Sequence, residues 1–208
     1  MSSVAFETGP VETGILILNS RGDLPTATYT IEAGTLDADD LYVGTGGTGH
    51  FVQHGGTVRV TDWLELTNRS TFSSSDGSGE GRYDISGGSL STRGLSLGRN
   101  GTGIFNQSQS SVDVTGTLDL AGTSRYTISS GDFAANALRL RPDDSGESIF
   151  VQDGGDVSVA SHVEIEGSGD ALASLERNGG TFAATTLELK QRSGGTQPPA
   201  SFRQTAGI

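Results

Sequence analysis

The residues best suited to chemistry in this sequence are carboxylates gathered in loops rich in glycine and serine. Asp143, Asp144 and Glu147 share one such loop, RPDDSGESI. Calcium prefers carboxylate and carbonyl oxygens in large coordination shells, so we predict a weak Ca²⁺ site there. The loop matches neither the helix–loop–helix calcium motif nor the glycine–aspartate nonapeptide. A solvated acidic surface without metal explains the same residues, and no other cofactor is predicted.

Catalytic groups are the next possibility. Enzymes that cleave acidic polysaccharides set a cation beside a base, and two pairs fit that description, Arg59 with Asp62 and Arg139 with Glu164. Salt bridges across neighbouring strands explain these pairs more simply. The three histidines, His50, His54 and His162, show no spacing typical of a metal site or a Ser-His-Asp triad. We predict that the protein is not an enzyme; the alternative is a β-helix that binds or cleaves polysaccharides, as a lyase or glycoside hydrolase.

The charge balance narrows the class of partner. Acidic residues number 25 against 13 basic ones, for a net charge of −12. Nucleic-acid binders need a basic surface, so no nucleic-acid partner is expected. No apolar run is long enough to cross a bilayer, and the first residues, MSSVAFETGP, lack the basic and apolar regions of a signal peptide. Cysteine is absent, so disulfides are excluded.

A repeat must position these residues. One copy runs from Tyr83 to Gly98 and reads YDISGGSLSTRGLSLG, with an aromatic residue at its start, a glycine five residues later, and three apolar-x-apolar segments. Copies begin at residues 6, 29, 51, 83, 105, 126, 150, 175 and 202. Two forms alternate: the tyrosine form has isoleucine at plus two, whereas the phenylalanine form has glutamine there and one extra residue before its last segment. The copy from Phe105 has Ser110 in place of the glycine.

This repeat predicts the fold. Alternation with period two indicates strands, and strands this short are stable only when copies stack and share a continuous core. We therefore predict an all-β, parallel β-helix solenoid of about eight turns, with three short strands per turn, as a single domain over residues 1–208. Parallel crossovers favour a right-handed winding.

The glutamines at plus two pose a question of their own. Alternation turns Gln53, Gln107, Gln152 and Gln204 inward, and a buried amide must be hydrogen-bonded. We predict that each satisfies backbone groups at its adjacent glycine turn; the alternative is a polar ladder for a ligand. Loops of variable length follow the third segment of each copy, so they should project along one edge, where a site is most expected.

The two ends of the repeat predict association. The copy from Phe202 stops after its first segment, and neither end shows a capping element, although solenoids need caps over their exposed backbone and apolar side chains. The chain is therefore expected to be part of a longer protein or the subunit of an end-to-end homo-oligomer, a head-to-tail contact that continues as a filament. The residues expected at such a contact are Phe6, Val11, Leu16, Leu18, Phe202, Gln204 and Ile208.

Two stretches carry a family resemblance. YTIEAGTLDADDLYVGTGGTGHFVQHGGTVRV and YDISGGSLSTRGLSLGRNGTGIFNQSQSSVDV resemble repeats of large bacterial surface proteins, the autotransporter passengers and the PEP-CTERM-associated repeat proteins, and the likeness extends from Tyr29 to Gly207. It implies a right-handed β-helix exported to the cell surface as a stalk, adhesin or matrix protein, with no catalytic residue carried over. The expected function is thus a non-catalytic, extracellular structural or adhesive module, with a glycan as a possible ligand.

Overall fold

The computed structural model describes residues 2–6, 10–18, 25–67, 79–143, 146–191 and 200–205, with the backbone alone for residues 2–6 and 10. The described residues form strands and turns without a helix, so they contain no helix long and apolar enough to cross a membrane. One sheet has nine strands: β1 Ser2–Phe6, β3 Ala27–Ile31, β5 Thr48–Gln53, β7 Gly79–Ile85, β9 Gly101–Gln107, β11 Thr123–Ile128, β13 Glu147–Gln152, β15 Leu172–Arg177 and β17 Ser201–Gln204. The other has eight: β2 Pro10–Leu18, β4 Thr35–Val43, β6 Thr57–Leu66, β8 Ser89–Leu97, β10 Ser110–Ala121, β12 Gly131–Arg141, β14 Asp156–Gly167 and β16 Thr181–Gln191.

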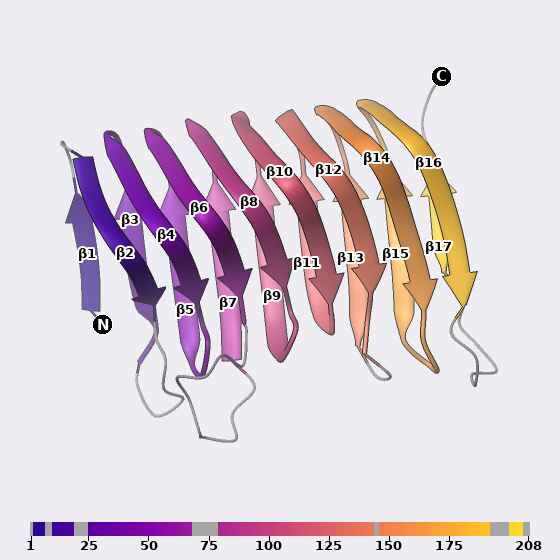
Figure 1. The fold of residues 1–208 in the computed structure, drawn as a ribbon, viewed down its shortest axis with the longest axis horizontal. Helices are drawn as coiled ribbons and strands as arrows, with labels where there is room; N and C mark the ends of the chain where they lie inside the picture. Colours follow the sequence, from indigo (N-terminus) through magenta and orange to yellow (C-terminus); the bar gives the residue numbers. More distant parts are fainter. Residues whose placement is uncertain are drawn as a thin grey trace.

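The chain winds as a β-solenoid. Successive strands alternate between the two sheets, and each pairs in parallel with its equivalent one repeat away, as β5 does with β7. In Figure 1 the nine-stranded sheet lies behind with its strands pointing up, the eight-stranded sheet lies in front with its strands pointing down, and the chain advances from left to right. That path is a right-handed coil. The eight strands of one sheet are separated by seven repeat intervals, and the nine strands of the other sheet by eight. The predicted parallel solenoid is therefore confirmed.

The number of strands per turn differs from the prediction, which is wrong on this point. The second and third segments of each copy are joined in one strand, so a turn contains two strands instead of three; β6, for example, includes both Val58–Val60 and Leu64–Leu66. Register shifts fall between the two segments, as between Val114 and Leu118 where β10 pairs with β8. The extra residue of the phenylalanine form is accommodated there as a bulge, which bends the strand without ending it.

In most of the described turns from the nine-stranded sheet to the other sheet, a glycine with positive φ joins the two strands. Gly88 has φ +76°, and a Cβ on it would lie 2.1 Å from the carbonyl oxygen of Gly56 in the turn below. Both the backbone angle and the stacking therefore require glycine. In the copy that carries Ser110, the positive φ moves to Gln109, at 49°, and the Gln109 amide donates to Ser130 Oγ.

Stacked rings fill the core beneath the nine-stranded sheet. The centroids of successive rings lie 4.6–5.1 Å apart and the rings are nearly parallel, in the order Tyr29, Phe51, Tyr83, Phe105, Tyr126 and Phe150. Each ring comes from a separate turn, and offset stacking at this spacing adds to the free energy of burial. Leu175 follows in the same column through its register with Phe150.

Three of the four inward glutamines, Gln53, Gln107 and Gln152, are buried and bond at their glycine turns, which confirms the predicted role for them, whereas Gln204 is exposed. Gln53 Nε2 donates to the carbonyl of Gly56 at its own glycine turn, at 3.3 Å, and to that of Ser89 in the next turn, at 3.1 Å. The prediction omitted one partner, because Tyr83 Oη in that next turn donates to Gln53 Oε1 at 2.7 Å. Gln107 repeats the arrangement with Tyr126. Each glutamine thus fastens its turn to the following one, which explains why the two forms of the repeat alternate.

Gln152 is the exception in this series. Its Nε2 donates to the carbonyls of Gly155 and Thr181, at 2.9 and 2.7 Å. The next turn offers Leu175 in place of tyrosine, and the buried Oε1 of Gln152 has no hydrogen-bond partner. In the two equivalent pairs, Tyr83 with Gln53 and Tyr126 with Gln107, a phenolic hydroxyl donates to this oxygen. That hydroxyl is what Gln152 lacks.

Candidate functional site

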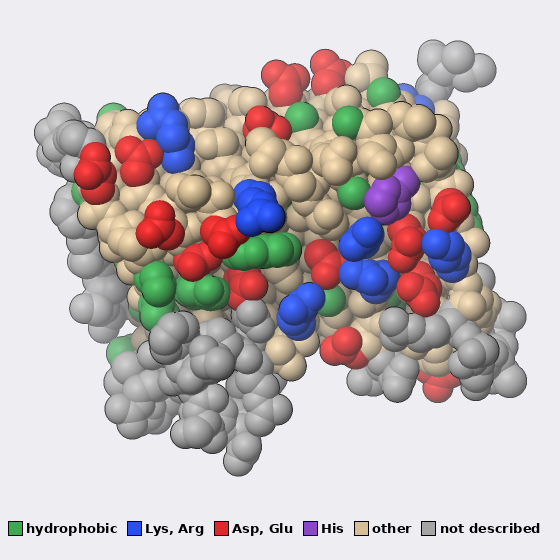
Figure 2. All heavy atoms as spheres, viewed as in Figure 1, with side chains coloured by type: hydrophobic (Ala, Val, Ile, Leu, Met, Phe, Trp, Pro, Cys, Tyr) green, Lys and Arg blue, Asp and Glu red, His purple; other side chains and the backbone are tan. Residues whose placement is uncertain are grey.

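The outer face of the eight-stranded sheet carries a group of exposed apolar side chains near its N-terminal end. It consists of the exposed Ile15 and Ile17 on β2, the half-buried Tyr42 on β4 and the exposed Trp63 on β6, which is 37% exposed. We call these four residues the apolar patch. Figure 2 shows green side chains gathered at the lower left of this face beside red carboxylates. Contiguous exposed apolar surface marks a binding surface more often than scattered residues do.

Sequence reasoning missed this patch, although a signal was present. Tyr42 lies between Leu41 and Val43, which alternation turns inward, so Tyr42 faces outward by the same rule. Trp63 directly precedes the inward Leu64 and lies at the bulge, where the alternation of inward and outward residues is interrupted. The direction of the Trp63 side chain therefore depends on the bend of the strand.

The Trp63 ring lies flat against β8. A Cβ placed on Gly94, its partner in register, would lie 2.5, 2.6 and 2.8 Å from ring atoms Cζ3, Cε3 and Cη2. A point beyond the ring edge would be much closer to one atom than to its two neighbours, so these similar distances place Gly94 under the face of the ring. One face of the indole is covered by backbone and the other faces outward.

Carboxylates border the apolar patch. Asp40 Oδ1 accepts the backbone N–H of Trp63 at 3.1 Å, and Asp62 Oδ1 accepts Arg93 Nη1 at 2.9 Å. The pKa of Tyr42 is raised, first by burial and then by the negative charges of Asp40, Glu65 and Asp62. Acceptor oxygens therefore surround the aromatic residues, and each carboxylate has capacity for further hydrogen bonds.

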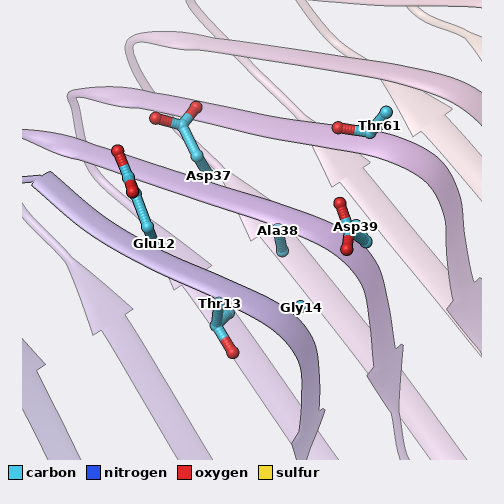
Figure 3. Close-up of a pocket in the computed structure, with 7 residues that line it drawn as sticks. All are labelled: Glu12, Thr13, Gly14, Asp37, Ala38, Asp39 and Thr61. Atoms are coloured by element: carbon cyan, nitrogen blue, oxygen red, sulfur yellow. The ribbon is translucent and has the colours of Figure 1, made fainter.

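A shallow acidic hollow adjoins the apolar patch. Figure 3 shows Glu12 and Asp37 side by side on neighbouring strands, with Asp39 and Thr61 farther along. The hollow measures about 400 Å³, and Thr61 lies two residues before Trp63 on β6. Asp37 accepts Arg59 Nη1 at 3.3 Å. Among the described residues, no group of three or more His, Cys, Asp or Glu side chains is placed to hold a metal ion.

A second polar cluster lies on the outer face of the nine-stranded sheet. Asp84 Oδ2 lies 2.7 Å from His50 Nε2 and 2.8 Å from Arg82 Nε, and Asp84 Oδ1 accepts Asn106 Nδ2 at 2.7 Å. Burial alone would raise the pKa of Asp84, but the hydrogen bonds from Arg82, Asn106 and His50 outweigh it and lower that pKa. A carboxylate held ionised in this way is a weak general base. Its hydrogen bonds join β5, β7 and β9, and we call these four residues the Asp84 clamp.

The sequence did not predict this cluster, because His50, Asp84 and Asn106 come from three different copies of the repeat. Strand register unites them: His50 pairs with Arg82, and Asp84 lies between Val52 and Asn106. The signal was available in the repeat, since these positions directly precede or follow the core aromatic of each copy.

Two residues of the predicted calcium loop, Asp143 and Glu147, line separate hollows. Asp143 lines a hollow of about 260 Å³ beside the Gly98 and Gly122 turns. Glu147 lines a different hollow of about 190 Å³, with Arg125 and Ile149. Asp144 lies outside the described residues. The described part of the loop therefore offers one carboxylate per hollow.

The predicted arginine–carboxylate pairs are rearranged. Arg59 pairs with Asp37, and Asp62 with Arg93, at 3.3 and 2.9 Å. Arg139 lies beside Glu164 in register, and Glu164 accepts Lys190 Nζ at 3.1 Å. Salt bridges across strands therefore account for Arg59 and Asp62, although their partners differ from those expected.

The residues expected at an end-to-end contact lie at the outermost described turns. Val11 and Leu16 are half-buried against the core and Leu18 is buried. Phe202 is half-buried near Phe182, with ring centroids 6.5 Å apart, and Gln204 is exposed. For Phe6 the structure gives the backbone pairing with Ile31, and Ile208 lies outside the described residues.

No protein-family model, no curated protein and no solved structure matches this chain.

Proposed function

We propose that this chain is a non-catalytic structural and adhesive module of the cell surface, a stiff spacer that carries one binding face. The observation that carries the proposal is the continuous link from turn to turn. Two parallel ladders, the ring stack from Tyr29 to Phe150 and the Gln53 and Gln107 bonds all join neighbouring turns. A solenoid joined in this way resists bending, which suits a stalk or matrix element.

Adhesion is supported by the apolar patch. The outer face of the eight-stranded sheet combines exposed aromatic side chains with bordering carboxylates, whereas most outward positions elsewhere on that face are polar. The extracellular setting rests on the resemblance of the repeats to those of bacterial surface proteins.

The proposal is tested by separating binding from turnover. Purified protein is incubated with immobilised neutral and acidic polysaccharides, and the bound fraction and the release of reducing or unsaturated sugars are measured together. We expect retention without release of products. If sugar products form in proportion to the amount of protein added, the protein is an enzyme and this proposal is wrong. If the protein is retained on no polysaccharide and on no bacterial cell wall, the adhesive part of the proposal is wrong.

A polysaccharide lyase is the second candidate, and the Asp84 clamp is the observation that favours it. Arg82 and His50 lie beside a carboxylate on one exposed face, which provides a cation and a base close together. If this candidate is correct, unsaturated products appear from an acidic polysaccharide, and His50→Ala and Arg82→Ala each abolish them. If such products persist in both variants, the clamp is not a catalytic site.

We also propose that the protein associates end to end with further copies of itself. Leu187 and Leu189 on β16 occupy inward positions, and Leu189 is 50% exposed while its register partner Ile165 is fully buried. A second copy stacked on β16 would cover them. Sedimentation at physiological salt should show a mass that rises with concentration and returns to the monomer mass in Leu187→Glu/Leu189→Glu; a monomer at all concentrations would contradict the proposal.

A further inference from the structure

We infer that the apolar patch binds an uncharged polysaccharide, with one sugar ring stacked on the outward face of Trp63. This inference rests on the proposed adhesive function and names its site and its ligand class. It begins with the indole, because a ring with one face covered by backbone and the other exposed is a ready platform for a flat ligand. The contact at Gly94 holds Trp63 in that orientation before any ligand arrives.

The chemistry of the platform favours a sugar. One face of a hexose ring presents several C–H groups, which carry partial positive charge and pack on the electron-rich face of an aromatic ring. The hydroxyl groups project around the rim of the sugar, where they need acceptors. Asp40 and Asp62 border Trp63. The backbone amide of Trp63 holds Asp40 in place, and Arg93 holds Asp62. Hydrogen bonds to ionised acceptors are stronger than those to neutral groups.

The charge of the site selects uncharged sugars. Asp40, Asp62 and Glu65 are close enough to Tyr42 to raise its pKa, and Glu12, Asp37 and Asp39 line the adjoining hollow. The whole chain has a net charge of −12. Around the patch and the hollow these carboxylates outnumber Arg59 and Arg93, so an anionic polysaccharide would meet a net negative charge, whereas a neutral one is not repelled.

The arrangement of the patch favours a polymer over a single sugar. Ile17, Tyr42 and Trp63 lie on three successive strands, β2, β4 and β6, and neighbouring strands are about 4.8 Å apart. In register, Ile17 and Tyr42 share a row with Glu65, and Trp63 lies two residues before Glu65 on β6. A chain laid obliquely across the three strands therefore passes over Ile17, Tyr42 and then Trp63. A protein partner suits this surface less well, because an apolar core of four side chains bordered by carboxylates is small for a stable protein interface.

Trp63 is itself the probe for the test, because it is the only tryptophan of the sequence. Neutral oligosaccharides of glucose, mannose and N-acetylglucosamine are titrated against the intact protein, with oligogalacturonate as the anionic comparison. We expect at least one neutral series to shift the Trp63 emission, to protect it from acrylamide quenching, and to bind more tightly as the oligosaccharide lengthens. Oligogalacturonate should do none of these.

Variants locate the site. Retention on the polysaccharide bound by the wild type should fall at least tenfold in Trp63→Ala and less in Trp63→Phe, which keeps a ring. Gly94→Ala should also weaken retention, because its methyl group displaces the indole without removing it. Ser158→Ala, at an exposed position on β14 of the same sheet, is the matched control and should bind like the wild type. Circular dichroism verifies that each variant is folded.

The outcomes separate this inference from the proposed function. If the wild type is retained on a polysaccharide and Trp63→Ala is retained equally, adhesion stands and the Trp63 site is refuted. If only anionic polysaccharides bind, the ligand class is refuted. If the protein binds cell-surface proteins and no glycan, the inference fails while adhesion survives, and if nothing binds, both fail.

Discussion

Tyr83→Phe removes one atom from the core and tests how consecutive turns are held together. The ring stays in the stack, since its neighbours Phe51 and Phe105 lie 4.6 and 4.9 Å away and contact the ring faces. The hydrogen bond from Tyr83 Oη to Gln53 Oε1, at 2.7 Å, is lost. Tyr83 and Gln53 are both fully buried, so water cannot replace the hydroxyl.

The magnitude follows from the acceptor that is left alone. A buried polar group without a partner costs about 1–3 kcal/mol, so the free energy of unfolding of Tyr83→Phe should fall by about that amount. For a chain of this size each kcal/mol corresponds to about 2–4 °C in the melting temperature. Urea unfolding followed by circular dichroism, together with hydrogen exchange of the amides of β5 to β8, measures the global and the local effect.

The matched control reverses the change where no acceptor exists. Phe105→Tyr places a hydroxyl in the same column, but there the preceding turn offers Ile85 in the place that Gln53 holds for Tyr83. We expect Phe105→Tyr to destabilise the protein, although tyrosine is the natural residue in the turns on either side. Equal stability of Tyr83→Phe and wild type, or a gain in Phe105→Tyr, would refute the argument that these bonds fasten the turns in pairs.

Three further changes test other parts of the structure. Leu175→Tyr should supply the hydroxyl that Gln152 Oε1 lacks and raise the free energy of unfolding by about 0.5–1.5 kcal/mol; a loss of stability measured by urea unfolding would show that the column has no room for it. Asp84→Asn should be less stable than the wild type near neutral pH and equal to it in acid. The lowered pKa of Asp84 means that its contribution is present above the unfolded pKa of about 3.9 and is lost as pH falls through the folded pKa; urea midpoints across this range measure the difference, and a constant gap at all pH values would contradict it. Gly88→Ala should cost more than about 1–2 kcal/mol, because positive φ and the nearby Gly56 carbonyl both exclude a methyl group, while Gly14→Ala, where the nearest atom is 3.6 Å away, should differ little in melting temperature.

The solenoid could be derived from the sequence because its cause is local and repeated. Inward residues such as Ile85, Leu90 and Leu95 have equivalents in most copies, with glutamine at the Ile85 position of the phenylalanine form, and only stacked turns bury all of them together. The burial of Gln53 and its bonds at the glycine turn followed from the same alternation. The merging of two segments into one bent strand did not follow, because a bulge and a turn look alike in a one-dimensional pattern.

Tertiary structure alone determined the hydrogen-bond partners of the side chains and the groups of residues that meet on the outer faces of the sheets. Tyr83 and Gln53 lie thirty residues apart and meet only because one turn stacks on the next. His50 and Asp84 form their pair for the same reason, through a register that loops of unequal length hide. The repeat determines which residues face outward, but which of them are neighbours, and that the ring of Trp63 lies flat over Gly94, depends on the stacking of turns that are distant in sequence.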